Sequence, residues 1–260
     1  MFPVAEQTKD KCRILIVENS DESRTALTLR LNGLGHTVLA AGAVADATAR
    51  QDLDQFDLIL SDLEDGNSPA NVEVVRAFKL SVTSARARAE TAAVHEIVEA
   101  ALLFKLRYID SGRVAFHEKI EFELPSDLSL MNIVLEYLLD RVDKMGLIKA
   151  EQSNLFVALD EAFVNAVKHG SRNDPTKLVR ITAELSPHEA IFTVEDEGEG
   201  FDVREIPDPR DPANLFKSTG RGVLLIYNIM DEVEYSEHGT RLRMVKRPDT
   251  KSEPPALAGG

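Results

Sequence analysis

The stretch from Leu155 to Gly170 constrains the fold most strongly, because its apolar and polar residues separate at helical spacing. At about 100° per residue, the apolar side chains form one stripe, made up of Leu155, Leu159, Ala162, Phe163 and Ala166. Glu161, Asn165 and His169 form a polar line beside it. The sequence therefore predicts a helix that begins near Ser153, an N-cap residue type, and ends at Gly170. Taken alone, the polar line is more typical of a solvated helix flank than of a site.

A second polar position follows a predicted strand. Ala190, Phe192 and Val194 fall on one side of the predicted strand at 190–195, so Asp196 continues on this inward side. Two glycines, Gly198 and Gly200, follow at once. A carboxylate that points inward needs a polar partner, because burying an unpaired charge is costly. The sequence thus predicts that Asp196 faces a polar ligand or partner.

A third segment places glycines at the start of an apolar helix. Gly220 and Gly222 precede the run 223–226, which consists of Val, Leu, Leu and Ile. Glycine at such a position lets backbone amides approach a phosphate at the helix N-terminus.

In this order and spacing, the three segments resemble the ATP site of the GHKL superfamily, which includes gyrase, Hsp90, histidine kinase and MutL ATPases. The motifs are Glu-x-x-x-Asn-x-x-x-His, Asp-x-Gly-x-Gly and Gly-Arg-Gly. Segments 208–216 and 230–233 are similar to those of the bacterial anti-sigma factor serine kinases within that superfamily. The resemblance covers residues 113–247 and implies a GHKL α/β sandwich that binds ATP and Mg²⁺.

The resemblance also implies roles for single residues. Glu161 becomes the general base, Asn165 a Mg²⁺ ligand, and Asp196 the acceptor for the adenine amino group. Such a division suits phosphoryl transfer, which depends mainly on positioning and charge neutralisation. The glycines become points where the backbone approaches the nucleotide, namely Gly198, Gly200, Gly220 and Gly222.

Three further positions are implied as nucleotide contacts. Thr219 precedes the glycines of the third motif, Arg221 lies between them, and His169 ends the first motif. For His169, a structural role at the helix end is at least as well supported as a phosphate contact. Arg221 could equally face solvent.

Residues 13–62 alternate between predicted strands and helices. The pattern predicts strands at 13–17, 37–40 and 56–62, with helices at 20–34 and 43–51 between them. This order implies a parallel sheet with a site at the carboxyl ends of its strands. Glu18 and Asp62 would both lie at that edge.

This half resembles a response-regulator receiver domain, a flavodoxin-like fold, with Asp62 at the phosphoacceptor position beside Glu18. Two departures favour a degenerate or truncated receiver over one that is phosphorylated. The usual acidic pair is here Glu18 followed by Asn19, and the fourth and fifth strands cannot be found after Asp62. Lys79 and Lys105 are candidates for the receiver lysine, though neither has a convincing strand context. Alternatively, Asp62 merely ends a strand.

The segment from about 71 to 112 is predicted to be a helical connector. Its apolar residues recur at steps of three and four, as in a coiled-coil seam, and include Val72, Val75, Phe78, Val82, Ile97, Ala100 and Leu103. Such a stripe favours pairing with a second chain, and hence a homodimer. The alternative is that the segment folds back to complete the shortened sheet. His95 resembles a histidine-kinase phosphoacceptor, but a lone histidine on a long helix is more often incidental.

The remaining pattern fits the ATPase-like half. It predicts a strand at 114–124, a helix at 126–145, a strand at 179–185 and a terminal hairpin at 233–247. The Asp- and Pro-rich segment 201–219 is a candidate lid, and residues 248–260 are predicted to be disordered.

Composition excludes several classes of partner. The formal net charge of −14 argues against a nucleic-acid surface, because DNA binding needs cationic groups. The single cysteine, Cys12, rules out an intramolecular disulfide and fits a reducing cytoplasm. No apolar run approaches the ~20 residues of a membrane span. We therefore expect a cytoplasmic protein without a membrane segment.

The sequence thus predicts a receiver-like domain at 11–70, a helical connector at 71–112, a GHKL kinase domain at 113–247 and a tail at 248–260. The resemblance implies that the chain phosphorylates a serine or threonine of an anti-sigma factor antagonist, a STAS-like protein, with a sigma factor as a further partner. Two alternatives remain open: an ATP-gated binding switch without catalysis, and an atypical histidine kinase that uses His95.

Overall fold

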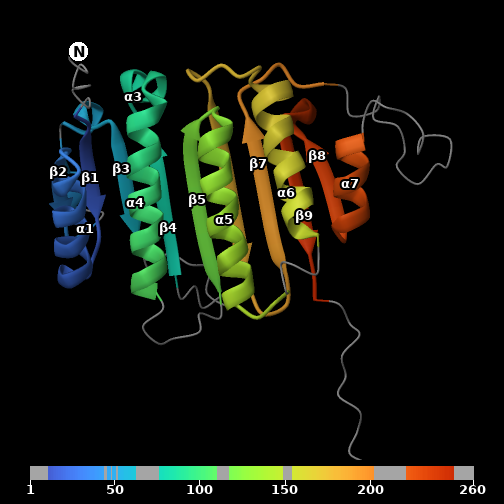
Figure 1. Ribbon diagram of the computed structural model, residues 1–260, viewed down its shortest axis with the longest axis horizontal. Coiled ribbons are helices and arrows are strands. Elements are labelled where there is room, and N and C mark those ends of the chain that lie inside the picture. The colour runs from blue at the N-terminus through green and yellow to red at the C-terminus, as the bar shows by residue number, and fades with distance from the viewer. Residues whose placement is uncertain are drawn as a thin grey trace, which may run out of the picture.

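The computed structural model describes residues 11–43, 46–47, 49–50, 52–62, 76–109, 117–148, 154–201 and 221–248. Within these residues, nine strands form one sheet in the order β2-β1-β3-β4-β5-β6-β7-β9-β8 (Figure 1). The predicted α/β class is confirmed.

The N-terminal strands are parallel, as predicted. The elements are β1 (Arg13–Val17), α1 (Asp21–Gly33), β2 (Thr37–Ala41), η1 (Leu53–Gln55) and β3 (Leu58–Asp62). β1 lies between β2 and β3 and pairs in parallel with both. Ser20 caps α1 by accepting a hydrogen bond from the backbone N–H of Ser23. Residues 44, 45, 48 and 51 of the predicted helix at 43–51 lie outside the described residues, and residues 46–47 are helical.

The predicted helical connector is wrong for residues 76–82, which form the strand β4 (Arg76–Val82). The short helix α3 (Ala85–Ala89) and the long helix α4 (Thr91–Ile109) follow it. Phe78, Leu80 and Val82 are buried, which is the two-residue period of a strand. Phe78 and Val82 suggested a helix because a spacing of four residues fits the period of a helix as well as that of a strand. Val72 and Val75 lie outside the described residues.

β4 joins the two halves of the sheet. It runs antiparallel to β3 and parallel to β5 (Glu118–Pro125). The alternative in which this segment completes the shortened N-terminal sheet is therefore confirmed for β4. Phe78, Val82 and Ile97 are buried in the chain's own core, so the continuous seam that suggested a second chain is absent from the described part of the connector. The homodimer itself stays a prediction.

The C-terminal half follows the predicted order of elements. It comprises α5 (Leu128–Lys144), α6 (Leu155–Val164), η2 (Asn165–Gly170), β6 (Leu178–Leu185), β7 (Ala190–Asp196), α7 (Arg221–Ile229), β8 (Glu232–Ser236), η5 (Glu237–Gly239) and β9 (Arg241–Lys246). β8 and β9 form the predicted terminal hairpin. The candidate lid and tail lie mainly outside the described residues.

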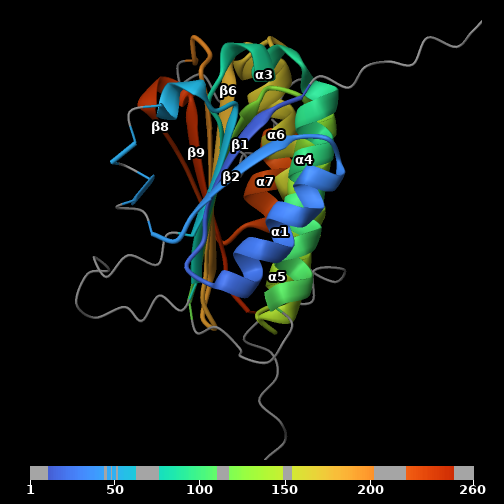
Figure 2. The same cartoon turned by 90° about the vertical axis from the view of Figure 1, so that its left-hand side faces the viewer.

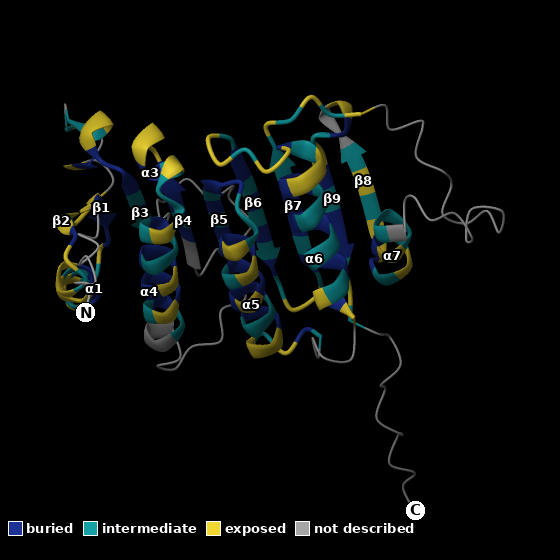
Figure 3. Ribbon diagram, turned by 45° about the horizontal axis from the view of Figure 1, so that its top comes forward, coloured by how far each residue is buried: buried dark blue, intermediate teal, exposed yellow. Residues whose placement is uncertain are grey.

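The helices α1, α4, α5, α6 and α7 lie on one face of the sheet (Figure 2). Their inner sides and the facing strand residues form the main core, while their outer sides are exposed (Figure 3). A smaller apolar cluster of Leu15, Val17, Ala47 and Phe56 belongs to the N-terminal strands. None of the helices in the described ranges has the length and apolar character needed to cross a bilayer.

Candidate functional site

Helix α6 and the turns of η2 that continue it present the predicted polar line to a cavity, while the apolar stripe is buried. Leu155, Leu159, Ala162 and Phe163 all pack into the core. The residue that precedes the helix is Asn154, which has a left-handed backbone (φ 53°) and makes no side-chain cap. The predicted cap, Ser153, lies outside the described residues. Burial of one side of α6 fixes the direction in which Glu161 points.

The helix widens at Asn165. Residues Asn165–Gly170 form π-helical turns, and the backbone N–H of Ser171 donates to the carbonyl of Ala166 at 2.8 Å, a separation of five residues. The helical path thus ends at Gly170 as predicted, but its last turns are wider than those of an α-helix. Such turns are frequent at functional sites.

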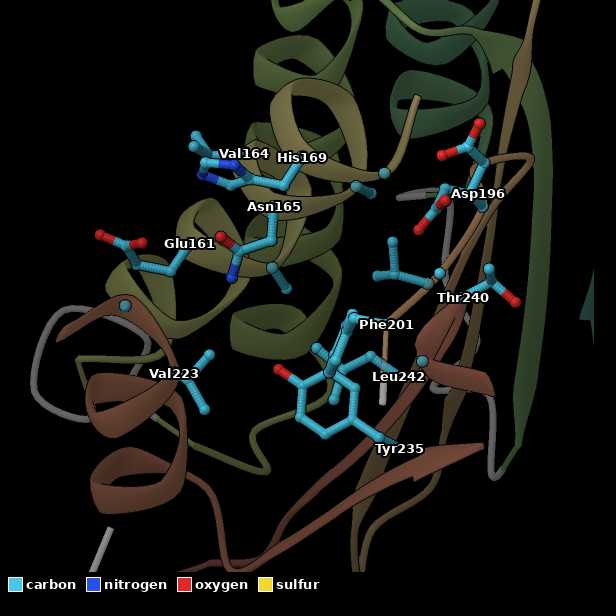
Figure 4. A pocket seen from close by; sticks show the side chains of 18 of the residues that line it. Glu161, Val164, Asn165, His169, Asp196, Phe201, Val223, Tyr235, Thr240 and Leu242 are labelled. Atoms are coloured by element: carbon cyan, nitrogen blue, oxygen red, sulfur yellow. The ribbon is translucent and has the colours of Figure 1, made fainter. Parts of the chain in front are cut away.

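Asp196 ends β7 and lies across the cavity from Asn165 (Figure 4). Its carboxylate accepts a hydrogen bond from the backbone N–H of Gly198 at 2.8 Å. Burial raises the pKa of Asp196 above its ordinary value of 3.8, and the Gly198 hydrogen bond and the charge of Lys177 offset only part of this rise. The carboxyl is therefore costly to ionise until it gains a hydrogen-bond donor.

Two glycines allow the backbone to enclose this carboxylate. A Cβ atom on Gly170 would overlap the carboxyl group of Asp196, and one on Gly198 would overlap the Gly170 carbonyl. A side chain at Gly198 would meet fixed backbone, whereas one at Gly170 would displace the Asp196 carboxylate, so the two segments fit closely around Asp196.

The cavity has a volume of about 650 Å³. It is lined by Glu161, Ala162, Val164, Asn165, Ala166, His169, Gly170, Arg172, Val194, Asp196, Glu199, Gly200, Phe201, Gly222, Val223, Tyr235, Gly239, Thr240 and Leu242. Six of the residues predicted from the sequence are therefore brought together, namely Glu161, Asn165, His169, Asp196, Gly200 and Gly222. Their individual roles stay predictions.

Other predicted residues do not line the cavity or cannot be placed. Gly198 touches the site through its hydrogen bond to Asp196. Thr219 and Gly220 lie outside the described residues. Arg221 begins α7, but its side chain is not described.

Several lining residues were not predicted from the sequence. Val223, Tyr235 and Leu242 give the cavity an apolar wall, and Thr240 adds a hydroxyl group. Tyr235 packs edge-on against Phe201 with ring centroids 5.5 Å apart, and burial raises the pKa of its phenol. The two-residue alternation of a strand is a signal for inward positions at Tyr235 and Leu242, but it does not distinguish a cavity wall from a core.

Charged groups at the cavity are mostly acidic. Glu161, Asp196 and Glu199 line it, while Arg172 forms an exposed ion pair with Glu199 at 2.7 Å. An anionic ligand would need a compensating cation there. Among the described residues, no cluster of three or more His, Cys, Asp or Glu side chains could hold a metal by itself. The Asn165 amide oxygen suits a Mg²⁺ ion whose remaining ligands come from phosphates and water.

The receiver-like edge brings together two of the residues proposed for it, Glu18 and Lys105. Glu18 is buried and forms an ion pair with Lys105 of α4 at 2.9 Å, and it also accepts a hydrogen bond from the backbone N–H of Ser20. One oxygen of Glu18 is therefore committed to an internal cation. Asp62 ends β3, but its side chain is not described, and its role as a phosphoacceptor stays a prediction.

Comparisons with known proteins agree with this geometry. The family model described as Histidine kinase-like ATPase domain matches residues 124–246. The Anti-sigma F factor of Clostridium perfringens (strain SM101 / Type A) is 34% identical over 107 residues, which span 38% of this chain and 75% of that protein. This chain belongs to the anti-sigma F factor family of histidine kinase-like ATPases.

The same half of the chain matches other relatives. The Serine-protein kinase RsbW of Staphylococcus epidermidis is 27% identical over 135 residues, which span 49% of this chain and 85% of that protein. A crystal structure of the RsbU and RsbW domains of a Mycobacterium tuberculosis protein matches with a TM-score of 0.36 and 14% identity, over 74% of this chain and 52% of that one. That TM-score is too low to bear on the fold.

Proposed function

We propose that this chain binds Mg²⁺ and ATP in the cavity between α6, β7 and α7, and that it is a protein serine/threonine kinase. The observation that carries this proposal is the convergence of Glu161, Asn165, Asp196 and Gly222 on one cavity of about 650 Å³. The Serine-protein kinase relative supports the type of reaction.

Each group has a distinct task in the proposed mechanism. Asp196 would accept a hydrogen bond from the adenine amino group, and Asn165 would hold Mg²⁺ through its amide oxygen. Bound Mg²⁺ would neutralise negative charge on the phosphates. Gly222 lets the backbone at the start of α7 approach them, where the helix dipole favours an anion.

Glu161 acts as the general base. It takes the proton from the serine or threonine hydroxyl of the protein substrate as that oxygen forms a bond to the γ-phosphorus. The bond between the γ-phosphorus and the bridging oxygen breaks, and ADP leaves with the electron pair. Glu161 lies on the cavity side of α6 with its carboxylate beside Gly222, which supports this role.

We further propose that the substrate is an anti-sigma factor antagonist of the STAS type, with a sigma factor as the second partner. The Anti-sigma F factor relatives support this partner class. A phosphate added to such a partner would introduce charge that disrupts a docked surface. The N-terminal strands and α4 would regulate the exchange.

Two measurements test the proposal. The purified chain should bind ATP saturably with Mg²⁺, and with ATP labelled at the γ-phosphate it should label a protein in lysate from its own cells, at a serine or threonine found by phosphosite mapping. The label should survive acid; an acid-labile label on the chain itself would instead indicate a histidine kinase that uses His95. Binding without transfer would leave the non-catalytic switch, and absence of saturable binding would contradict the proposal.

A further inference from the structure

A row of polar side chains crosses the sheet face that lies opposite the described helices. Ser81 of β4 lies opposite Glu123 of β5, and Glu123 lies opposite Arg180 of β6. These polar residues alternate with apolar core residues such as Leu80 and Phe122, so they project from the other face. The row therefore extends from the N-terminal half of the sheet into the ATPase half.

Glu123 is the centre of this row. One carboxylate oxygen accepts hydrogen bonds from the Lys79 ammonium and the Ser81 hydroxyl, both at 2.9 Å, and the other accepts from Arg180 Nε at 3.0 Å. Partial burial raises the pKa of Glu123, but hydrogen bonds from Lys79, Arg180 and Ser81 outweigh it and leave the pKa below its ordinary value. Glu123 therefore stays ionised at neutral pH and holds all three donors.

Arg180 carries the row to the loop that follows β7. Its Nη2 atom donates to Glu197 Oε1 at 3.0 Å, and the backbone N–H of Leu178 donates to Glu197 Oε2 at 3.0 Å. Both carboxylate oxygens of Glu197 thus accept hydrogen bonds from donors on β6. Glu197 lies between Asp196 and Gly198, so its anchoring constrains the segment whose carboxylate faces the cavity.

We propose that Lys79, Ser81, Glu123, Arg180 and Glu197 form a relay through which β4 positions Asp196 and thereby tunes the selectivity of the site for adenine. This inference rests on the proposed function, because it assumes that Asp196 accepts a hydrogen bond from the adenine amino group. Lys79, Ser81 and Glu123 precede residues 124–246, the part that matches the ATPase family model. The relay thus connects the ATPase half to residues outside that match.

The same face supplies a matched control. Lys119 of β5 pairs with Glu121 at 2.7 Å on the same side of the sheet, and Glu121 also lies 3.9 Å from Lys79 at the edge of the relay. The ion pair of Lys119 is thus with Glu121 and not with Glu123 or Glu197, the residues that connect to Asp196. An ordinary exposed ion pair contributes little to stability, whereas a connected network can contribute more. A neutral substitution of Lys119 should therefore remove one surface charge without changing the hydrogen bonds that hold residues 196–198.

The test compares ATP with inosine triphosphate, which lacks the amino group at position 6 of the base. In the full chain, Lys79→Gln and Glu123→Gln should weaken ATP binding about two- to fivefold, the range expected for partly exposed ion pairs. Inosine triphosphate binding should stay unchanged, because Asp196 gives it no favourable hydrogen bond. The ATP preference should therefore fall in both variants and be retained in Lys79→Arg and Lys119→Gln.

A second measurement separates this inference from the proposed function. Amide hydrogen exchange of residues 196–201 should be faster in Lys79→Gln than in Lys119→Gln, with or without nucleotide. If the natural chain binds ATP but the ATP preference is the same in all variants, the relay is overturned and the proposed function stands. If the natural chain binds no nucleotide, the proposed function fails and the adenine selectivity fails with it. Equal exchange rates would then also overturn the positioning of residues 196–201 by β4, whereas faster exchange in Lys79→Gln would support that positioning alone.

Discussion

Gly222, the second residue of α7, lies directly against the carboxylate of Glu161 on α6. A methyl group on Gly222 would overlap Glu161 Oε2. The start of α7 and the proposed general base are therefore placed by the same contact. A change at Gly222 should alter the chemistry through Glu161 as well as through the backbone.

Glu161→Ala should separate binding from transfer. We expect ATP affinity to be kept and phosphotransfer to fall about 10²- to 10⁴-fold, the range for loss of a general base. Asp196→Asn should instead weaken ATP binding, because a hydrogen bond to a charged acceptor contributes about 1.5–3 kcal/mol. Titration of both variants with labelled ATP checks this. Equal loss of binding in the two variants would contradict the division of roles.

Gly222→Ala should reduce transfer because the added methyl group must displace Glu161. We expect a loss of activity that approaches that of Glu161→Ala, with a smaller effect on the melting temperature than on the rate. Gly33→Ala is the matched control, since a Cβ atom there would have no neighbour within 4 Å. Full transfer activity in Gly222→Ala would show that the contact does not constrain the base.

ATP affinity should depend on pH through Asp196. Burial raises the pKa of this carboxyl above 3.8, so its ionised, hydrogen-bond-accepting form is lost at a higher pH than for an ordinary aspartate. Affinity should fall as the pH is lowered through that raised pKa. Folding stability should change in the opposite sense: with the native pKa above the unfolded one, stability is lost as the pH rises through the interval between them.

Calorimetric titration across a pH series, with thermal melts at each pH, measures both effects. Asp196→Asn is the control, because it removes the titrating group while ATP and the other carboxylates still titrate. A pH profile of affinity that is identical in this variant and in the natural chain would assign the dependence to other groups.

The sequence predicted those features whose pattern is local. The helix of Leu155–Gly170 and the strand that ends at Asp196 have clear periods, and the spacing of their polar residues led to the residues that line the cavity. Tyr235 and Leu242 were not predicted as lining residues, because an apolar residue at an inward strand position indicates a core equally well.

Long-range pairing could not be predicted in the same way. β4 was predicted as helix because Phe78 and Val82 satisfy both periods, and only pairing with β3 and β5 decides between them. The partners of Glu123 are 42 and 57 residues away at Ser81 and Arg180. Such contacts depend on the order of the strands, which local patterns do not specify.

Removal of the Lys105 charge should destabilise the fold strongly. The side chains of Lys105 and Glu18 are only 8% and 5% exposed, so Lys105→Met would leave Glu18 buried without its ammonium partner. We expect a loss of about 3–5 kcal/mol in the free energy of unfolding, measured by urea denaturation. Lys144→Met, which removes an exposed pair with Asp140, should cost at most about 1 kcal/mol. A similar cost for both variants would show that Glu18 tolerates the loss of the Lys105 ammonium.

Separation of residues 113–260 from the rest of the chain should make the ATPase half associate with itself. The cut removes β4, which leaves one edge of β5 with unpaired backbone groups. It also removes Phe78, whose ring packs edge-on against Phe122 and Tyr137 at centroid distances of 5.9 and 5.8 Å. An exposed apolar strand edge is a template for pairing with another copy. Light scattering across a concentration series should show larger species for this fragment than for a chain that lacks only residues 1–10. A fragment that stays monomeric and melts at the temperature of the full chain would show that β4 is dispensable for the ATPase half.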